Sequence, residues 1–164
     1  MRVFVTGASG WVGSAVVNEL IAKGHSVLGL ARSDEKAAAV AKAGADVHRG
    51  SLEDLDSLRR GAARADGVVH TAFSHDFSRF AQNGQDELRA IGALSDELAG
   101  SGKPLVVTSG LAFLGGGKLA TEDEIVAAGA HAVPRDPETP TMNAAVNGVR
   151  SSLVRLSPSV HGDG

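Results

Sequence analysis

Short apolar runs alternate along this chain with longer segments in which apolar residues recur every three or four positions. Compact runs rich in valine and leucine are typical of buried strands, whereas the three- and four-residue spacing predicts helices with one apolar face. The strands are expected at residues 2–6, 26–31, 46–49, 67–72, 104–109 and 151–156. The helices are expected at residues 14–23, 34–43, 77–99 and 138–146, with a short additional helix that opens at Ser51.

This alternation of strands and helices predicts an α/β protein built from parallel βαβ units. Right-handed crossovers and two βαβαβ halves give a Rossmann-type, doubly wound parallel sheet with strand order 3-2-1-4-5-6 and helices on both faces. A chain of 164 residues suits one domain, so residues 1–164 are expected to form a single unit.

One stretch breaks the regular pattern. Residues 114–141 contain three consecutive glycines, at 115–117, and three prolines. Long irregular stretches in compact domains are typically functional or disordered. This one follows the strand expected at 104–109, so we expect it over the carboxyl edge of the sheet, where ligands bind in folds of this type.

Composition narrows the classes of function. The net charge is −3 and aromatic residues make up 4% of the chain, which suits nucleic-acid binding poorly. No apolar run reaches the ~18 residues of a membrane span, and no signal peptide precedes the first strand. The chain has no cysteine, and no spacing of His, Asp or Glu residues fits a metal site. We therefore expect a cytoplasmic protein with no metal, nucleic-acid or membrane partner.

A glycine loop, TGASGWVG at residues 6–13, joins the first strand to the first helix. Gly7 lets the chain turn sharply, Gly10 leaves room for a phosphate, and Gly13 lets the helix pack closely on its strand. Unpaired N–H groups and the positive end of the helix dipole then face the anion. The loop predicts a dinucleotide pyrophosphate site, and the alternative is a tight turn without a ligand. The residues expected to contact the cofactor here are Gly7, Ser9, Gly10, Trp11, Val12 and Gly13.

The end of the second strand indicates which dinucleotide to expect. An acidic residue there accepts hydrogen bonds from a free ribose 2′-hydroxyl, whereas an arginine accommodates a 2′-phosphate. Arg32 stands close to this position and Ser33 adds a donor, whereas Asp34 comes one or two positions late for NAD. The sequence therefore favours NADP, with NAD as the alternative. Arg32 could otherwise be a solvated charge at the strand end.

Residues that follow the next two strands extend the expected binding surface. Ser51 and Leu52 could border the adenine, and Ser51 with Asp54 also resembles a capping box that opens a helix. The small residues Thr71 and Ala72, followed by Phe73, let a cofactor lie across the sheet.

Three polar residues lie near the end of the fourth strand. His75 and Asp76 are expected at the carboxyl edge of the sheet, where they are candidates for contact with a substrate. The alternative role of Asp76 is to cap the N-terminus of the long helix that follows. His70, within the strand, is interpreted as a packed strand residue rather than a catalyst.

Several motifs, taken in order, resemble one known family. The glycine loop resembles the TGxxGxxG loop of the extended and atypical short-chain dehydrogenases/reductases, the NAD(P)-dependent epimerase/dehydratase group. VHTA at residues 69–72, VTSG at 107–110 and VRLSPSVHG at 154–162 resemble that group's fourth-, fifth- and sixth-strand motifs. Together these motifs cover essentially the whole chain.

The resemblance implies hydride transfer at the nicotinamide, coupled to proton transfer at a substrate oxygen. The fifth-strand motif ends in the family's catalytic serine, here Ser109, which would hold the substrate oxygen. Its alternative role is that of a strand-end hydroxyl that caps the next turn. The sixth-strand segment, here Pro158, Ser159 and Val160, would approach the nicotinamide.

The chain departs from the family pattern at the proton donor. The family uses a Tyr with a Lys four residues later, but this chain contains no Tyr. Between residues 110 and 150, where the pair would lie, the only lysine is Lys118. His131 and Arg135 have the four-residue spacing, but Pro134 between them argues against a helix there.

The family's C-terminal substrate domain is also absent from this chain, so the sequence indicates either a fragment of a longer protein or a bare nucleotide-binding domain. The first functional hypothesis is an NADP-dependent oxidoreductase that acts on a carbonyl, alcohol or nucleotide-sugar-like small molecule. The second is a non-catalytic NAD(P)-binding sensor or regulatory protein. The missing Tyr favours the second hypothesis, whereas Ser109 and the segment 158–160 favour the first. Relatives often pair through their fourth and fifth helices, which suggests a homodimer, but the helix expected at residues 138–146 is short.

Overall fold

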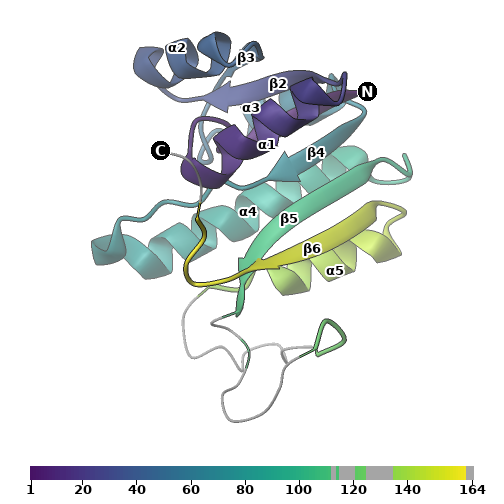
Figure 1. The fold of residues 1–164 in the computed structure, drawn as a ribbon. Coiled ribbons are helices and arrows are strands. Elements are labelled where there is room, and N and C mark those ends of the chain that lie inside the picture. The colour runs from purple at the N-terminus through teal and green to yellow at the C-terminus, as the bar shows by residue number, and fades with distance from the viewer. Residues whose placement is uncertain (112–113, 115–120, 125–134, 162–164) are drawn as a thin grey trace.

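A six-stranded parallel sheet organises the molecule (Figure 1), which is a computed structural model describing residues 1–111, 114, 121–124 and 135–161. The strands are β1 (Arg2–Thr6), β2 (Ser26–Ala31), β3 (Asp46–Arg49), β4 (Gly67–His70), β5 (Pro104–Gly110) and β6 (Arg150–Leu156). Their order is β3-β2-β1-β4-β5-β6, and every paired neighbour runs parallel. The predicted strand order is confirmed, and the sheet is open rather than closed into a barrel.

Helices cover both faces of this sheet. The helices are α1 (Trp11–Ala22), α2 (Asp34–Lys42), α3 (Leu55–Ala63), α4 (Phe80–Leu98) and α5 (Glu138–Val146), and the 3-10 turn η1 (Phe77–Arg79) precedes α4. Figure 1 shows α1 on one face of the sheet and α4 and α5 on the other. The doubly wound α/β architecture predicted from the alternating pattern is therefore confirmed.

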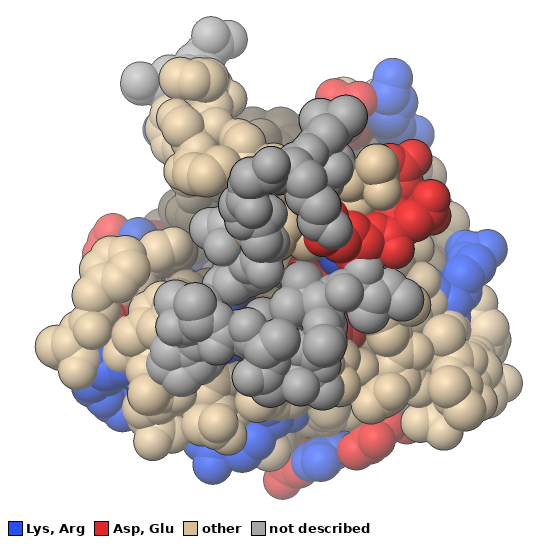
Figure 2. Space-filling view, turned by 90° about the horizontal axis from the view of Figure 1, so that it is seen from below, with Lys and Arg blue, Asp and Glu red and all other residues tan. Residues whose placement is uncertain are grey.

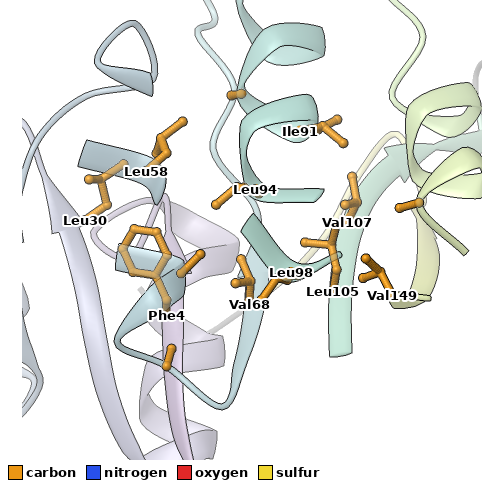
Figure 3. Packing of buried hydrophobic residues seen from close by; sticks show 14 of the residues in the cluster. Phe4, Leu30, Leu58, Val68, Ile91, Leu94, Leu98, Leu105, Val107 and Val149 are labelled. Atoms are coloured by element: carbon orange, nitrogen blue, oxygen red, sulfur yellow. The ribbon is translucent and has the colours of Figure 1, made fainter. Parts of the chain in front are cut away.

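Two apolar clusters, one on each face, hold the layers together. Along β1 the side chains alternate: Phe4 packs among residues of α3, α4 and α5, whereas Val3 and Val5 pack among residues of α1 and α2. Figure 3 shows Phe4 and its neighbours in the larger cluster. Gly61 on α3 permits this contact, because a Cβ there would lie 2.4 Å from the Phe4 ring.

Helix starts differ most from the sequence predictions. The capping box expected at Ser51 is wrong, because α3 begins at Leu55 and the Asp54 carboxylate accepts the capping hydrogen bond from Ser57 N at 2.9 Å. The first helix begins at Trp11, directly after the last loop residue Gly10, rather than at Ser14. Strand β4 ends at His70, so the next six residues have no regular structure.

Part of the irregular stretch between β5 and α5 lies outside the described residues. The sequence features at residues 115–118, His131 and Pro134 belong to that part, whereas Arg135 is described. Among the described helices, none is both long enough and apolar enough to cross a membrane. In the view of Figure 2, uncharged residues occupy most of the described surface, and Lys and Arg side chains are spread around its rim.

Candidate functional site

A cavity of about 870 Å³ runs along the carboxyl edge of the sheet, from the end of β2 to the segment after β6. In an open parallel sheet this edge is the expected ligand site, since the strand order reverses between β1 and β4. The sequence-predicted residues that line it are Gly7, Ser9, Gly10, Trp11, Val12, Gly13, Arg32, Ser51, Leu52, Thr71, Ala72, Phe73, His75, Asp76, Ser109, Pro158 and Val160. Ser33 and Ser159 are not among its lining residues.

The glycine loop forms the centre of this cavity wall. Gly7 adopts a φ of +70°, and a Cβ on it would lie 2.7 Å from Thr71 Oγ1 and 2.9 Å from Ala72 N. A Cβ on Gly13 would lie 2.0 Å from the Gly7 carbonyl oxygen. The loop therefore brings the start of α1 against the ends of β1 and β4 as closely as the backbone permits.

The first turn of α1 is suited to an anion. Its N-cap, Gly10, has no side chain to accept hydrogen bonds from the first N–H groups, and the first turn contains no acidic residue. The orphan N–H groups of a helix start and the positive dipole end favour a phosphate under these conditions. The residues present therefore fit the pyrophosphate of a dinucleotide.

Two cations line the cavity beyond β2. Arg32 is exposed, and Lys36 lies one helical turn later on α2. Ser33 caps α2 by accepting a hydrogen bond from Lys36 N at 3.3 Å, which gives its hydroxyl a structural task. The Asp34 carboxylate accepts a hydrogen bond from Arg49 Nη2 at 2.6 Å, so it is engaged with β3 rather than with the cavity. Lys36 was missed by sequence reasoning, although a second cation four residues after Arg32 was a usable signal.

Ser51 and Leu52 follow the end of β3 and line the cavity together with Leu30 of the neighbouring strand β2. Neither residue belongs to α3, so both remain in an irregular segment that borders the cavity. Gly50 is tightly packed here, because a Cβ would lie 2.0 Å from Ser57 Oγ. Glu53 also lines the cavity and was not predicted.

The segment after β4 is held by its own hydrogen bonds. Asp76 caps η1, accepting hydrogen bonds from Ser78 N at 3.1 Å and Ser78 Oγ at 2.6 Å. These hydrogen bonds lower the pKa of the exposed Asp76 carboxyl. Asn83 Nδ2 donates to the carbonyl oxygens of Ser74 and Asp76, at 3.1 and 2.8 Å. The capping role expected as the alternative for Asp76 is therefore present, at a 3-10 turn rather than at α4 itself.

Aromatic rings surround His75 at this end of the cavity. The His75 ring makes edge-on contacts with Phe73 and Phe77, with centroids 5.5 and 6.3 Å apart. Phe77 also stacks on Phe80 at 6.0 Å and is 73% exposed. His75 therefore lines the cavity while its ring packs against the aromatic side chains of Phe73 and Phe77.

His70 lies beneath the cavity and does not line it. Its Nδ1 is 2.8 Å from Thr6 Oγ1, and its Nε2 has no hydrogen-bond partner among the described residues. Burial, reinforced by the nearby Arg135 charge, lowers the pKa of His70 to about 4. The imidazole is thus neutral at physiological pH, as suits a packed strand residue.

Arg135 is a cavity residue that the sequence did not reveal as one. Its Nε and Nη2 donate to the two carboxylate oxygens of Glu87, at 2.7 and 2.6 Å, and its guanidinium lies 4.2 Å from the centroid of the Phe73 ring. Glu87 is 1% exposed, and burial raises its pKa against the opposing effect of Arg135. The signal in the sequence was Glu87 itself, an acidic residue on the apolar face of α4.

Ser109 lines the cavity at the end of β5, and its hydroxyl forms a hydrogen bond with a residue outside the cavity lining. Ser109 Oγ donates to Glu138 Oε1 at 2.9 Å. Glu138, in the first turn of α5, also accepts from Arg155 Nε at 3.0 Å and Arg155 Nη2 at 2.8 Å. The neighbouring Thr108 Oγ1 donates to the His70 carbonyl oxygen at 3.2 Å. Sequence reasoning missed Glu138 as the partner of Ser109 and Arg155 as the partner of Glu138.

The segment after β6 closes the far end of the cavity. Pro158 and Val160 line it, together with Leu156 and Ser157. The Ser159 carbonyl oxygen accepts a hydrogen bond from the Ser157 hydroxyl, which holds this segment in a tight turn. Among the residues that the structure describes, no group of three His, Asp or Glu side chains gathers as a metal would require.

Comparison with known proteins identifies the family behind this geometry. The model of the NAD-dependent epimerase/dehydratase family matches residues 3–104, which carry the glycine loop and four of the six strands. The chain belongs to the NAD-dependent epimerase/dehydratase family. Members of this family depend on NAD or NADP, so the cavity's fit to a dinucleotide agrees with its family.

Individual relatives match this chain over different lengths. An uncharacterized protein of Schizosaccharomyces pombe is 46% identical over 171 residues, covering all of this chain and 56% of that protein. The chain thus spans about half the length of this relative. A 4-hydroxy-2-methyl-3-oxo-4-farnesyl-3,4-dihydroquinoline-1-oxide ketoreductase of Stigmatella aurantiaca is 43% identical over 72 residues, 44% of this chain and 22% of that enzyme.

The fold has a close counterpart among solved structures. A protein from Bacillus halodurans, described as a candidate NAD-dependent epimerase/dehydratase, superposes with a TM-score of 0.76. It is 22% identical, and the match covers 99% of this chain and 73% of that one. This similarity establishes the Rossmann-type fold over the length of the chain.

Proposed function

We propose that this chain is the cofactor-binding part of an NADP(H)-dependent oxidoreductase that transfers hydride between the nicotinamide and a carbonyl or alcohol substrate. The observation that carries the proposal is one continuous cavity that joins the glycine loop, Arg32, Ser109 and the Pro158–Val160 segment. These are the parts that the family resemblance assigns to the pyrophosphate, the adenosine ribose, the substrate oxygen and the nicotinamide, respectively.

The residues present define how the cofactor would be held. The N–H groups at the start of α1 would bind the pyrophosphate, and Ser51 and Leu52 would border the adenine. Thr71, Ala72 and Phe73 would support the middle of the cofactor where it crosses β4.

Positive charge beyond β2 supports NADP rather than NAD. Arg32 and Lys36 both line the cavity there, whereas the nearest carboxylate along the chain, Asp34, is hydrogen-bonded to Arg49. A guanidinium and an ammonium together suit a 2′-phosphate, and a free 2′-hydroxyl would need an acceptor at this place.

When bound, NADPH would donate the hydride or NADP⁺ would accept it. The side chains of the protein would bind and orient the substrate. Ser109 is the residue proposed to hold the substrate oxygen. His75 and Asp76 lie at the rim of the same cavity, where a small-molecule substrate would enter.

One experiment tests the proposal directly. Trp11 lines the cavity, so quenching of Trp fluorescence reports nucleotide binding. NADPH and NADH are titrated against the full-length protein. Absorbance of the reduced cofactor is then followed with two matched pairs, 2-propanol with acetone and cyclohexanol with cyclohexanone. Failure to bind either nucleotide would reject the proposal.

A non-catalytic NAD(P) sensor is the second candidate, because the chain lacks the family's tyrosine. The same titration separates the two functions. Tight nucleotide binding by the full-length protein, without turnover of any carbonyl or alcohol in a broad panel, would favour the sensor.

The proposal extends to assembly and location. A homodimer through α4 and α5 is supported by Met142 and Val146 on α5, which are 56% and 87% exposed. Light scattering of the wild-type protein and the Val146→Glu variant tests it, since a buried glutamate would dissociate the dimer. A cytoplasmic location, where NADP is available, is tested by cell fractionation.

A further inference from the structure

The hydroxyl hydrogen of Ser109 already takes part in a hydrogen bond within the protein. Ser109 is 4% exposed, and its Oγ donates to Glu138 Oε1 at 2.9 Å. A hydroxyl has one hydrogen and two acceptor lone pairs, and a carboxylate can only accept. Toward the cavity that it lines, Ser109 therefore offers an acceptor rather than a donor.

Glu138 stands behind Ser109 as a fixed carboxylate. It is 6% exposed and is not among the residues that line the cavity, so it reaches the cavity through Ser109. Arg155 binds both of its oxygens, at 3.0 and 2.8 Å, and donates a further hydrogen bond to the Glu124 carbonyl oxygen at 2.6 Å. The hydrogen bond to Glu138 raises the pKa of the Arg155 guanidinium. These hydrogen bonds fix the position of the Glu138 carboxylate behind Ser109.

The direction of this hydrogen bond selects the ligand. A ketone oxygen is an acceptor and finds no donor at Ser109 while the hydroxyl hydrogen points to Glu138. An alcohol hydroxyl is a donor and completes a continuous chain from substrate to Ser109 to Glu138.

We propose that Ser109 and Glu138 form a proton relay through which a secondary alcohol loses its hydroxyl proton during oxidation. This inference rests on the proposed function. In the step, the hydride of the carbinol carbon leaves to NADP⁺ and the alcohol O–H proton passes to Ser109 Oγ. The original Ser109 proton passes to the Glu138 carboxylate at the same time. The products are a ketone, NADPH and a protonated Glu138, which then releases its proton to solvent.

The relay answers the chemical problem set by the missing tyrosine. Alcohol oxidation needs a proton acceptor, and a carboxylate held near the reacting oxygen through one hydroxyl can supply it.

The test uses the full-length protein with NADP⁺ and the alcohols 2-propanol and cyclohexanol. Ser109→Ala is the primary variant, because it removes the relay and leaves Glu138 paired with Arg155. Glu138→Gln removes the terminal acceptor, and the double variant completes a thermodynamic cycle. Asp46→Asn is the matched control, since Asp46 is a carboxylate paired with Arg2 at 2.8 Å at the start of β3, on the opposite edge of the sheet.

Each single variant is expected to lower kcat for alcohol oxidation by about 100-fold, the scale of general acid–base catalysis. The double variant is expected to be no slower than Ser109→Ala, because Glu138 acts only through Ser109. Asp46→Asn is expected to keep wild-type activity.

A second readout is independent of turnover. In protein labelled with ¹³C at glutamate carboxyl groups, the Glu138 resonance is assigned by its loss in Glu138→Gln. That resonance is expected to shift in Ser109→Ala and to remain unchanged in Asp46→Asn. An unmoved resonance would show that the hydrogen bond is absent and would overturn the relay.

The outcomes also separate the relay from the proposed function. If Ser109→Ala oxidises the alcohols at the wild-type rate, or if the two single effects multiply in the double variant, the relay is wrong and the oxidoreductase stands. If the protein reduces the ketones but oxidises neither alcohol, the relay again fails alone. If no nucleotide binds, both proposals fall.

Discussion

Arg135 and Glu87 form a two-pronged ion pair between the segment that leads into α5 and the buried face of α4, with donor–acceptor distances of 2.7 and 2.6 Å. Their side chains are 14% and 2% exposed. The same guanidinium lies over the Phe73 ring and lines the cavity. This pair therefore links the fourth helix, the fourth strand's end and the entrance to α5 at one wall of the site.

Removing one member of this pair is expected to cost more than removing both. Glu87→Met leaves a largely buried guanidinium without its carboxylate, and we expect a loss of about 3 kcal/mol in the free energy of unfolding. Glu87→Met/Arg135→Met also removes the guanidinium charge that Glu87 neutralises and is expected to recover at least half of that loss. Urea unfolding of the three proteins measures both values, and equal losses in the single and double variants would contradict the argument.

Gly13→Ala is expected to damage both folding and nucleotide binding. The new Cβ would lie 2.0 Å from the Gly7 carbonyl oxygen and 2.6 Å from the Gly7 carbonyl carbon, and backbone cannot move aside as a side chain can. The start of α1 must then shift, and we expect a loss of about 3 kcal/mol in stability.

Gly92→Ala on α4 is the matched control, because a Cβ there meets nothing within 4 Å. It is expected to stabilise the protein by about 0.5–1 kcal/mol through the better helix propensity of alanine. Thermal unfolding and Trp11 fluorescence with NADPH are measured on both variants. If Gly13→Ala bound NADPH as tightly as the wild type, the assigned role of the loop would be wrong.

The architecture was predictable because its signals are local. Strand and helix periods repeat within ten or so residues, and Val3, Phe4 and Val5 already alternate between two faces in a run that continues into a glycine loop. The order of these units along the chain then leaves few parallel topologies. The helix expected at residues 138–146 is also found there, as α5.

Partners that are distant in sequence were not predictable. Glu87 and Arg135 are 48 residues apart, and no local pattern joins them. Ser109 was identified from its motif, but the hydrogen bond to Glu138 depends on how α5 returns to the sheet. The start of α3 was predicted too early because Ser51 and Asp54 are both suitable N-caps, and the structure uses Asp54. Ser51 and Leu52 therefore lie outside the helix, where they border the cavity.

Arg32→Ala is expected to weaken NADPH binding by roughly 10- to 100-fold, the loss of one or two charge-assisted hydrogen bonds, and to change NADH binding little. Lys36→Ala is expected to act in the same direction with a smaller effect, because its ammonium also lies 3.4 Å from Glu35 Oε1. Both nucleotides are titrated by Trp11 fluorescence.

Arg59→Ala is the control for this pair of variants. Arg59 is an arginine on α3 that pairs with Asp56 at 2.9 Å and does not line the cavity. It is expected to leave the affinity for both nucleotides unchanged. Equal losses of NADPH and NADH affinity in Arg32→Ala would refute the 2′-phosphate role.

Stability is expected to fall as the pH is lowered from about 6.5 to about 4, because of His70. Its pKa in the folded protein is about 4, below the ordinary value of 6.5 that it regains on unfolding. Within this window the unfolded chain binds a proton that the folded protein does not, so acid favours unfolding. The full difference corresponds to about 3 kcal/mol by linkage, all of it present above pH 6.5 and lost progressively below.

Urea unfolding at pH 7.5, 6, 5 and 4.5 measures the slope, and His70→Val, which cannot titrate, is expected to flatten it. An unchanged slope in His70→Val would assign the acid sensitivity to other groups.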